Sequence, residues 1–246
     1  MNPIEFNKNV TFLIKTFNRP FHLYRLLNSI SDYYPNAKKI IVNDGDIHID
    51  LTKYPNVSLH TLPFNQGISY GRNFLCQLAN TKYIMLLDDD FIITKNSNLH
   101  KLFELIETTD YDMIAGSVYD KENGKRKLEG TILFKENELH ILPINSDNEI
   151  IKCDFIPNFF IAKLSSLKKI SWDNHLKINE HIDFFIRAKG KLNIACYKKP
   201  YILHDKMPIN ENYVAYRNLT EQYNKYFANK YDVHTIYIFD SCIKLI

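Results

Sequence analysis

Three consecutive carboxylates, Asp88, Asp89 and Asp90, follow directly on the apolar run at residues 84–87. Acids clustered at the end of a buried strand repel one another, and burying them is costly unless a cation offsets that repulsion. A hard divalent ion such as Mg²⁺ or Mn²⁺ suits carboxylate oxygens and commonly accompanies the phosphates of a nucleotide. Taken alone, the three acids fit a metal site and a solvated acidic turn equally well.

Other polar residues at the ends of apolar runs could join such a site. Asp44, before Gly45, fits either a turn or an acceptor for the N3–H of uracil. Arg72 offers a planar fork to a phosphate or nucleobase, or lies exposed in the first turn of a helix. His204 follows the apolar residues 201–203, and its imidazole suits Mn²⁺, although a lone histidine at a strand end is more often structural.

Two further carboxylates are candidates for a general base. Glu180 begins a predicted helix over residues 180–189, and Asp183 lies three residues later on the same face. A carboxylate at this position either stabilises the N-terminus of the helix or deprotonates a bound hydroxyl. Taken alone, the stabilising role is the more common one for Glu180. If one of the two is a base, Glu180 at the start of the helix is the better placed, with Asp183 as the reserve candidate.

The elements that position these residues alternate between strand and helix. Asn18 is predicted to cap a helix that has Arg19 and Pro20 in its first turn. Apolar runs and helical spacing predict strands over 10–14, 39–42, 57–62 and 83–87, and helices over 68–79 and 98–107. The alternation predicts an α/β protein with a parallel sheet and helices on both faces. Ligands bind such sheets beyond the carboxyl ends of the strands, where the acids fall.

The second half of the chain follows a different pattern. Turn signals at 123–124 and 136–137 separate strand-like runs over 128–134 and 138–142, which predicts an antiparallel insertion. A strand over 193–197 and an aromatic-rich helix over 213–231 are predicted after it. We expect one domain with a nucleotide-binding half (8–115), an acceptor-binding half (116–206) and a C-terminal helical extension (207–246).

The composition is that of an ordinary soluble globular protein. The 246 residues are 45% hydrophobic and 24% charged, and the net charge of +3 is too small to indicate a nucleic-acid partner. The four scattered cysteines indicate neither a zinc site nor a disulfide framework. No secretory leader or membrane span is recognisable, so we expect a cytoplasmic enzyme.

The order of the motifs resembles a known enzyme family. From the N-terminus onward, the motifs are LIKTFNRP, IIVNDGD, LPFNQGISYGRN, MLLDDDF, DFIPNFFIAK, INEHIDFFIR and YILHDK. This succession, over roughly residues 10–206, resembles the nucleotide-sugar-dependent glycosyltransferases of family two. It is most similar to β-1,4-N-acetylgalactosaminyltransferases of the GM2/GD2-synthase type, family twelve. The resemblance implies the GT-A fold, with a Rossmann-like, mostly parallel central sheet flanked by helices.

The resemblance also assigns roles to individual residues. It implies a nucleotide-sugar site formed by Thr16, Asn18, Arg19, Asp44, Asn65, Gly67, Arg72, Asp88 and Asp89. Within it, Asp44 binds the uracil and Asp88 the ribose or donor sugar. It implies that Asp90, helped by His204, binds Mn²⁺ or Mg²⁺. The acceptor or donor-sugar side is expected to include Asn158, Phe159, Trp172 and His181. Aromatic faces suit the apolar faces of sugars, although Phe159 fits the core equally well.

The implied activity is that of an inverting, metal-dependent glycosyltransferase. A sugar of the GalNAc, Gal or GlcNAc type would pass from a UDP-sugar to a hydroxyl of a glycan or lipid-linked glycan, in bacterial surface polysaccharide or lipooligosaccharide synthesis. A lipid-linked acceptor would bring the protein to the inner face of the membrane as a peripheral protein. His181 stands where relatives often have an acid, which leaves the base between Glu180 and Asp183.

Two alternatives come from other functional classes. Sugar-nucleotide pyrophosphorylases of related fold carry a glycine-rich phosphate loop after the first strand, and KTFNRP has no glycine. A degenerate domain that binds a nucleotide or glycan without turnover is the nonenzymatic alternative, and the complete set of acid and histidine positions argues against it. The oligomeric state has no signature in the sequence.

Overall fold

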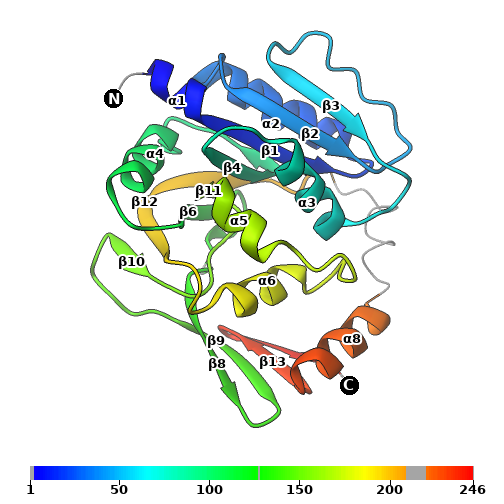
Figure 1. Ribbon diagram of the computed structural model, residues 1–246, viewed down its shortest axis with the longest axis vertical. Coiled ribbons are helices and arrows are strands. Elements are labelled where there is room, and N and C mark those ends of the chain that lie inside the picture. Colours follow the sequence, from blue (N-terminus) through cyan, green and yellow to red (C-terminus); the bar gives the residue numbers. More distant parts are fainter. Residues whose placement is uncertain (1–2, 127, 209–219, 246) are drawn as a thin grey trace.

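A mixed β-sheet runs through the centre of the molecule (Figure 1). The structure is a computed structural model and describes residues 3–126, 128–208 and 220–245. The order of the strands across the sheet is β10-β12-β6-β11-β4-β1-β2-β3. Their bounds are β1 Val10–Thr16, β2 Lys38–Asn43, β3 Val57–Thr61, β4 Tyr83–Asp88, β6 Met113–Asp120, β10 Ile150–Lys152, β11 Phe160–Lys163 and β12 Ile194–His204. Two short strands, β5 (Phe91–Ile92) and β7 (Gly124–Lys125), pair with β12 and β6.

The N-terminal half of the sheet is parallel, as the sequence predicts. Strand β1 pairs in parallel with β2 and β4, and β2 pairs in parallel with β3. The register places Thr16 beside Asn43, and Lys15 beside Asp88. Strands β1, β2 and β4 therefore end level with one another. The polar residues that follow these strands meet at one edge of the sheet.

The other half of the sheet is mixed. Strand β11 is antiparallel to both neighbours, β4 and β6, whereas β6 and β12 are parallel. Strand β12 extends well past the predicted 193–197 because an irregularity between Cys196 and Tyr201 shifts its register without ending it. This extension carries His204 to the level of Asp120, at the end of β6.

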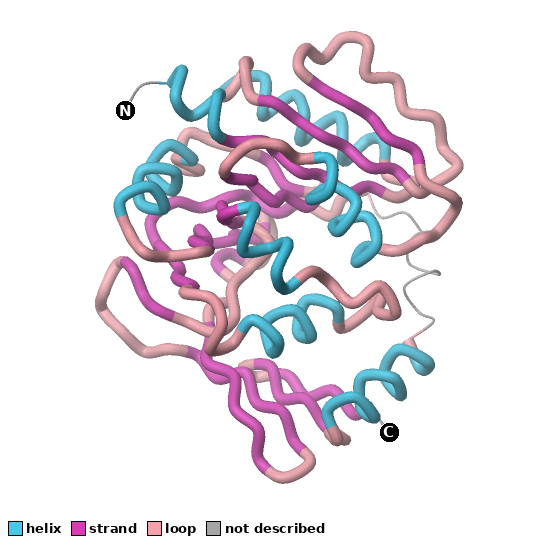
Figure 2. Tube along the Cα trace, viewed as in Figure 1, coloured by secondary structure: helices cyan, strands magenta, loops and turns pink. Residues whose placement is uncertain are grey.

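Helices cover both faces of the central sheet (Figure 2). The helices are α1 Pro3–Asn9, α2 Pro20–Tyr33, α3 Ile68–Leu78, α4 Leu99–Thr108, α5 Leu164–Ile170, α6 Glu180–Ala188 and α8 Glu221–Tyr231. Successive residues of β1 point to opposite faces and belong to separate apolar clusters. Phe12 packs with Leu23 of α2 and Leu102 of α4, whereas Leu13 shares a cluster with Leu75 of α3.

The C-terminal segment adds strands as well as a helix. The predicted hairpin is present as β8 (Gly130–Lys135) and β9 (Glu138–Pro143). Strands β13 (Thr235–Ile238) and β14 (Ser241–Lys244) extend this second sheet, because β13 pairs in parallel with β9. The extension predicted as helical over 207–246 therefore contains strands as well, because the alternation in 235–238 suits a half-buried strand. Residues 213–219 of the predicted helix 213–231 lie outside the described residues.

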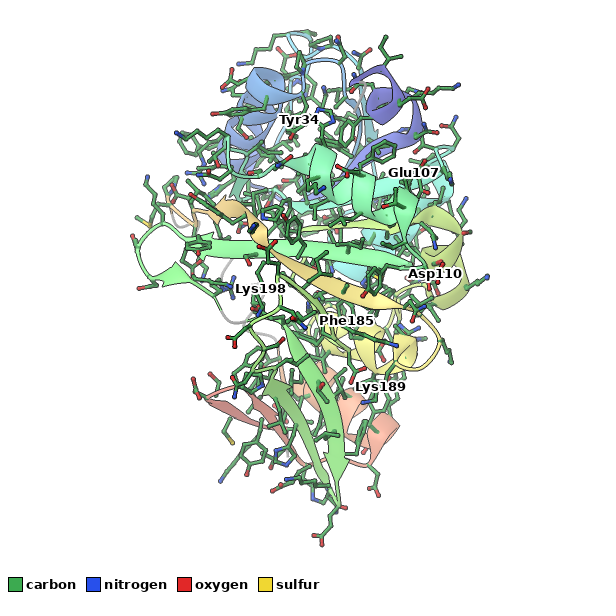
Figure 3. All side chains as sticks on the ribbon, turned by 90° about the vertical axis from the view of Figure 1, so that its left-hand side faces the viewer. Tyr34, Glu107, Asp110, Phe185, Lys189 and Lys198 are labelled. Carbon is green, nitrogen blue, oxygen red and sulfur yellow. The ribbon has the colours of Figure 1, made fainter. Side chains whose placement is uncertain are left out.

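The second sheet packs on the same core as α6. Phe185 of α6 shares a buried cluster with Ile132 of β8, Leu139 of β9 and Ile236 of β13. Figure 3 shows Phe185 between the central sheet and the smaller sheet. The second sheet thereby supports the helix that begins with Glu180.

Candidate active site

Each acid of the 88–90 cluster has a cationic partner within the chain. Arg72 of α3 donates from Nη2 to Oδ1 of Asp88 at 3.0 Å. Arg19 contacts Asp89 and also donates from Nη1 to Oδ2 of Asp90 at 3.0 Å. The chain's own arginines therefore offset the repulsion among the acids, so the cluster by itself does not require a metal ion.

Asp89 is the buried member of the cluster. Its side chain is 1% exposed, and Thr16 donates a hydrogen bond from Oγ1 to Oδ2 of Asp89 at 2.6 Å. Burial raises the pKa of Asp89, and the charge of Arg19 opposes that rise. Thr16, Arg19 and Asp89 thus bind one another, which ties the end of β1 to the acidic turn after β4.

Asp90 and His204, the predicted metal ligands, lie together. Nε2 of His204 is 3.4 Å from Oδ2 of Asp90, and Nδ1 is 2.5 Å from Oδ1 of Asp120. Burial raises the pKa of Asp90, but His204 and Arg19 outweigh it and hold that pKa below its usual range. Burial lowers the pKa of His204, but Asp90 and Asp120 outweigh burial, so the pKa of His204 lies above its usual value.

This donor set fits a divalent cation. One carboxylate and one imidazole nitrogen are suitable ligands for Mn²⁺ or Mg²⁺ when a diphosphate and water supply the remainder. No group of three or more His, Cys, Asp or Glu side chains within the described residues is arranged to hold a metal ion by itself.

Arg72 joins the acidic cluster to the candidate base. Its side chain is 1% exposed, and Nη1 lies 3.5 Å from Oε1 of Glu180 at the start of α6. Asp88 is the most exposed of the three acids, at 29%, and Asn158 donates from Nδ2 to Oδ2 of Asp88 at 3.0 Å. Asp88, Asn158, Arg72 and Glu180 are therefore linked in one polar network at the carboxyl edge of the sheet.

Asp44 is fully buried by its own chain. Its Oδ2 accepts a hydrogen bond from the backbone N–H of Gly67 at 2.8 Å, and its Oδ1 pairs with Nζ of Lys15 at 2.5 Å. The backbone N–H of Asn65 also donates to the carbonyl of Asp44 at 2.8 Å. In this structure Asp44 therefore positions the loop that leads into α3, where Gly67 has the positive φ of 96°.

Asn18 does not cap α2, contrary to the sequence prediction. Its backbone has φ 52°, and its Oδ1 accepts hydrogen bonds from the N–H groups of Asp46 and Ile47 at 2.9 and 3.1 Å. The side chain bridges two loops at the same edge of the sheet. Arg19 occupies the N-cap position of α2 without a side-chain cap, and Pro20 begins the helix.

Two aromatic residues expected on the sugar side are part of the core. Trp172 is 4% exposed and stacks on Phe184, with ring centroids 4.6 Å apart and an interplanar angle of 19°. Phe159 is 0% exposed. Both rings are buried in this structure, so neither offers a face to a sugar here. The ring centroid of Trp172 instead lies 5.6 Å from Cζ of Arg72, so the indole makes a cation–π contact with the guanidinium.

His181 is held as a neutral imidazole beside Glu180. Its Nε2 lies 2.8 Å from the carbonyl oxygen of Ile156, and its ring meets Phe155 and Phe185 edge-on. Burial in this apolar surrounding lowers the pKa of His181 to about 3. Nε2 is taken up by the Ile156 carbonyl and the ring packs against two phenylalanines, and these contacts favour a structural role for His181 over that of a base.

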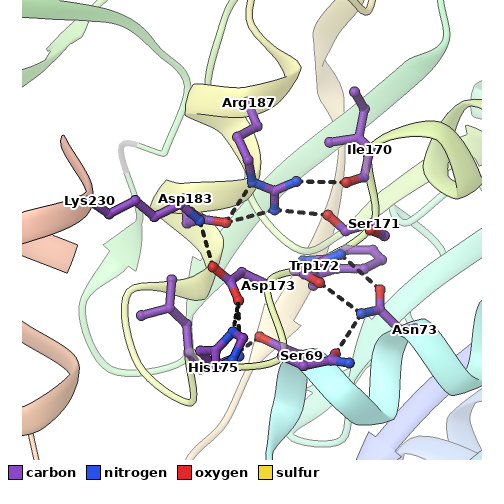
Figure 4. A network of polar contacts seen from close by, with 12 residues as sticks. Ser69, Asn73, Ile170, Ser171, Trp172, Asp173, His175, Asp183, Arg187 and Lys230 are labelled. Carbon is purple, nitrogen blue, oxygen red and sulfur yellow. Dashed lines mark hydrogen bonds and ion pairs between the residues drawn. The ribbon is translucent and has the colours of Figure 1, made fainter. Parts of the chain in front are cut away.

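Asp183 is saturated by contacts with other residues of the chain, and Figure 4 shows it between Arg187 and Lys230. Arg187 donates to its Oδ2 from Nε and Nη2 at 2.9 and 2.6 Å. Lys230 and Tyr231, both of α8, donate to its Oδ1 at 2.6 and 2.7 Å. The reserve assignment of Asp183 as a base is not supported, because these four hydrogen bonds use the carboxylate to dock α8 onto α6.

The amino-acid sequence matches a known protein family. The profile of the family described as "Glycosyl transferase family 2" matches residues 11–171, which is more than half of the chain. The chain belongs to glycosyl transferase family 2. The expected α/β architecture with helices flanking a mixed, mostly parallel sheet is confirmed, and it is consistent with the GT-A fold of this family.

Curated relatives of this family 2 domain come from mammals and bacteria. Beta-1,4 N-acetylgalactosaminyltransferase 2 of Mus musculus is 29% identical over 230 residues, covering 89% of this chain and 44% of that protein. Minor teichoic acid biosynthesis protein GgaB of Bacillus subtilis (strain 168) is 25% identical, covering 79% of this chain and 23% of that protein. The chain thus spans less than half the length of both relatives.

A solved structure supports the fold. The crystal structure of S. aureus TarS 1-349 superimposes with a TM-score of 0.60 at 18% identity, covering 80% of this chain and 60% of that chain. Within the described residues of this family 2 domain, no helix is both long and apolar enough to cross a membrane.

Sequence reasoning missed two residues that organise the site. Lys15 is the partner of Asp44. The one sequence signal near it is a glycine inside a helix, Gly71 of α3. In the structure a Cβ at Gly71 would lie 2.7 Å from Cγ of Lys15, so the lysine side chain packs against this glycine. Asp120, the partner of His204, ends strand β6 as Asp88 ends β4. An acid at the carboxyl end of a parallel strand is the signal that could have identified it.

Proposed function

We propose that this family 2 domain transfers a sugar from a UDP-sugar to a hydroxyl of a glycan, with inversion at the anomeric carbon. The observation that carries the proposal is the position of Arg72 between Asp88, 3.0 Å away, and Glu180, 3.5 Å away. The acid that we propose to bind the donor and the candidate base therefore lie on two sides of one guanidinium.

Glu180 has the role of general base in this proposal. Its carboxylate lies at the N-terminus of α6, 3.5 Å from Nη1 of Arg72. It takes the proton of the acceptor hydroxyl while that oxygen attacks the anomeric carbon from the face opposite to the UDP. One such displacement forms the new glycosidic bond, breaks the bond to the diphosphate and inverts the configuration.

Asp88 and Asn158 bind the donor in this proposal. Asp88 is the most exposed carboxylate of the cluster, and Nδ2 of Asn158 already holds one of its oxygens at 3.0 Å. The Oδ1 atom of Asn158 is buried and has no hydrogen-bond partner among the described residues. It is therefore suited to accept a hydrogen bond from a hydroxyl or amide of the donor sugar.

Asp90 and His204 would hold the Mn²⁺ or Mg²⁺ ion that family 2 enzymes typically use. When bound, such an ion supplies positive charge to the leaving diphosphate, so no protein acid is needed there. Arg19, 3.0 Å from Asp90, stabilises the carboxylate and adds to the positive charge at the same edge.

The names of the relatives support a choice of substrates. N-acetylgalactosaminyltransferases and a teichoic acid biosynthesis protein are both similar to this chain. We therefore propose UDP-GalNAc as the first donor to test, and a bacterial surface polysaccharide or lipooligosaccharide as the acceptor.

The proposal is tested by measuring UDP release. The protein is incubated with Mn²⁺ and, separately, UDP-GalNAc, UDP-GlcNAc, UDP-Gal and UDP-Glc, with Glu180→Gln as the matched control. We expect release from one donor, strongly reduced in the variant. Pyrophosphate-dependent cleavage of the donor would identify a pyrophosphorylase instead. Donor binding without any release, even with glycan acceptors, would indicate a nonenzymatic binding domain.

A further inference from the structure

His204 is held between carboxylates from two other strands. Asp90 follows β4 and Asp120 ends β6, and the parallel register places the Cα of Asp120 directly beside that of His204. Asp120 contacts Nδ1 at 2.5 Å, and Asp90 lies 3.4 Å from Nε2. The two ring nitrogens therefore have different carboxylate neighbours, at different distances.

The contact at Nδ1 determines where the proton of a neutral ring resides. An ionised carboxylate can only accept a hydrogen bond, and a neutral imidazole has a single N–H. With Oδ1 of Asp120 at 2.5 Å, that N–H is on Nδ1. The lone pair of the ring is then on Nε2, which faces Asp90 and is the atom available to a cation.

Asp120 is itself held in place. Nε of Arg126 lies 3.6 Å from Oδ2 of Asp120, and the backbone N–H of Arg126 donates to the carbonyl of Val118 at 2.9 Å. Strand β7 folds back on β6 and pairs Gly124 with Asp120. The short turn after β6 thus brings Arg126 close to Oδ2 of Asp120, while Oδ1 of Asp120 contacts His204.

The backbone after His204 is fixed independently of Asp120. The N–H of Asp205 donates to the carbonyl of Asp90 at 3.0 Å. From α2, Arg25 donates to the carbonyl of Met207 at 2.8 Å, and the ring of His22 lies 2.9 Å from the carbonyl oxygen of Lys206. With the backbone held at these points, the remaining freedom of His204 is the rotation and tautomer of its ring.

We propose that Asp120 is a positioning residue that orients His204 and fixes its Nδ1–H tautomer, so that Nε2 and Asp90 together bind the divalent cation. This inference rests on the proposed function, because that function names Asp90 and His204 as the metal ligands. Carboxylates that hold a metal-binding histidine commonly affect metal affinity by 10- to 100-fold when they are replaced. In this proposal Asp120 acts through His204 and not through the donor or the acceptor.

The test measures Mn²⁺ affinity of the UDP complex by electron paramagnetic resonance of the free ion. We expect Asp120→Asn to weaken Mn²⁺ binding about 10- to 100-fold, and Asp120→Glu, which keeps the carboxylate, to recover most of it. Asp112→Asn is the matched control. Asp112 precedes the opposite end of β6, where it accepts hydrogen bonds from Ser166 and the N–H of Asn193. It should leave Mn²⁺ affinity unchanged.

A second readout separates orientation from general destabilisation. In the Mg²⁺- and UDP-bound protein, ¹⁵N shifts of the His204 ring should show the proton on Nδ1, and in Asp120→Asn a mixture of tautomers. His204→Ala tests the metal site itself. If His204→Ala leaves Mn²⁺ affinity unchanged, the proposed metal site fails. If His204→Ala weakens binding while Asp120→Asn keeps wild-type affinity and tautomer, the positioning role of Asp120 is overturned.

Discussion

The Nη1 atom of Arg72 lies 3.5 Å from Oε1 of Glu180, although the two residues are far apart in the chain. Arg72 comes from α3 and Glu180 from the start of α6, and the same guanidinium also binds Asp88. This arrangement links the donor side of the site to the candidate base, and it explains why Arg72 is buried: both of its charged ends have carboxylate partners.

Replacing Glu180 should separate catalysis from donor binding. Glu180→Gln keeps the shape of the side chain and removes its charge. We expect kcat to fall by about 10²- to 10⁴-fold, the usual contribution of a general base, with UDP-sugar affinity nearly intact. Steady-state kinetics and calorimetric titration with UDP measure the two effects. Wild-type kcat in this variant would remove Glu180 from the mechanism and reopen the choice of base.

Replacing Asp183 should chiefly affect stability. Asp183 is fully buried and accepts hydrogen bonds from Arg187, Lys230 and Tyr231. Asp183→Asn leaves two cations without their buried partner, and we expect the free energy of unfolding to fall by about 3–5 kcal/mol. Urea denaturation monitors this change, with Tyr231→Phe as a milder control that removes one hydrogen bond. An Asp183→Asn protein of normal stability and no turnover would instead make Asp183 catalytic.

His181 should make the protein less stable in mild acid. Its pKa is about 3 in the folded state and about 6.5 in an unfolded chain. Between these values the unfolded state binds more protons, so stability increases with pH and is lost as the pH falls below about 6.5. At pH 5 the loss from this residue is about 2 kcal/mol. His181→Gln keeps a donor near the Ile156 carbonyl, and urea unfolding at pH 5 and 7 should show a correspondingly smaller difference than in the wild type.

The cysteines should differ sharply in reactivity. Burial raises the pKa of Cys76 and of Cys196 to about 12, and burial also raises the pKa of Cys153. Cys242 is exposed on β14. Because the thiolate is the reactive form, we expect a disulfide reagent such as DTNB to label one of the four cysteines in the native protein and all four after unfolding. Cys242→Ser should abolish the native reaction, and rapid labelling of a second thiol would contradict the burial of the others.

The sequence by itself determined the alternation of elements and the edge at which the site lies. Continuous apolar runs identified β1 and β4, and helical spacing identified α3, because both patterns record which faces of an element are buried. Since parallel strands end at a common edge, the polar residues after them could be placed together without any coordinates. The order of the motifs predicted membership of glycosyl transferase family 2, and the profile match over residues 11–171 confirms that prediction.

Only the tertiary structure decided which charges are paired. Arg19 and Asp89 are separated by 70 residues, and no local pattern distinguishes a partner at that distance. Glu180 and Asp183 share the first turn of α6, yet one meets Arg72 and the other meets Lys230. Trp172 resembled a sugar-binding aromatic and is buried against Phe184. Helical periodicity describes the face on which a side chain lies, whereas its partner depends on what the rest of the chain packs against that face.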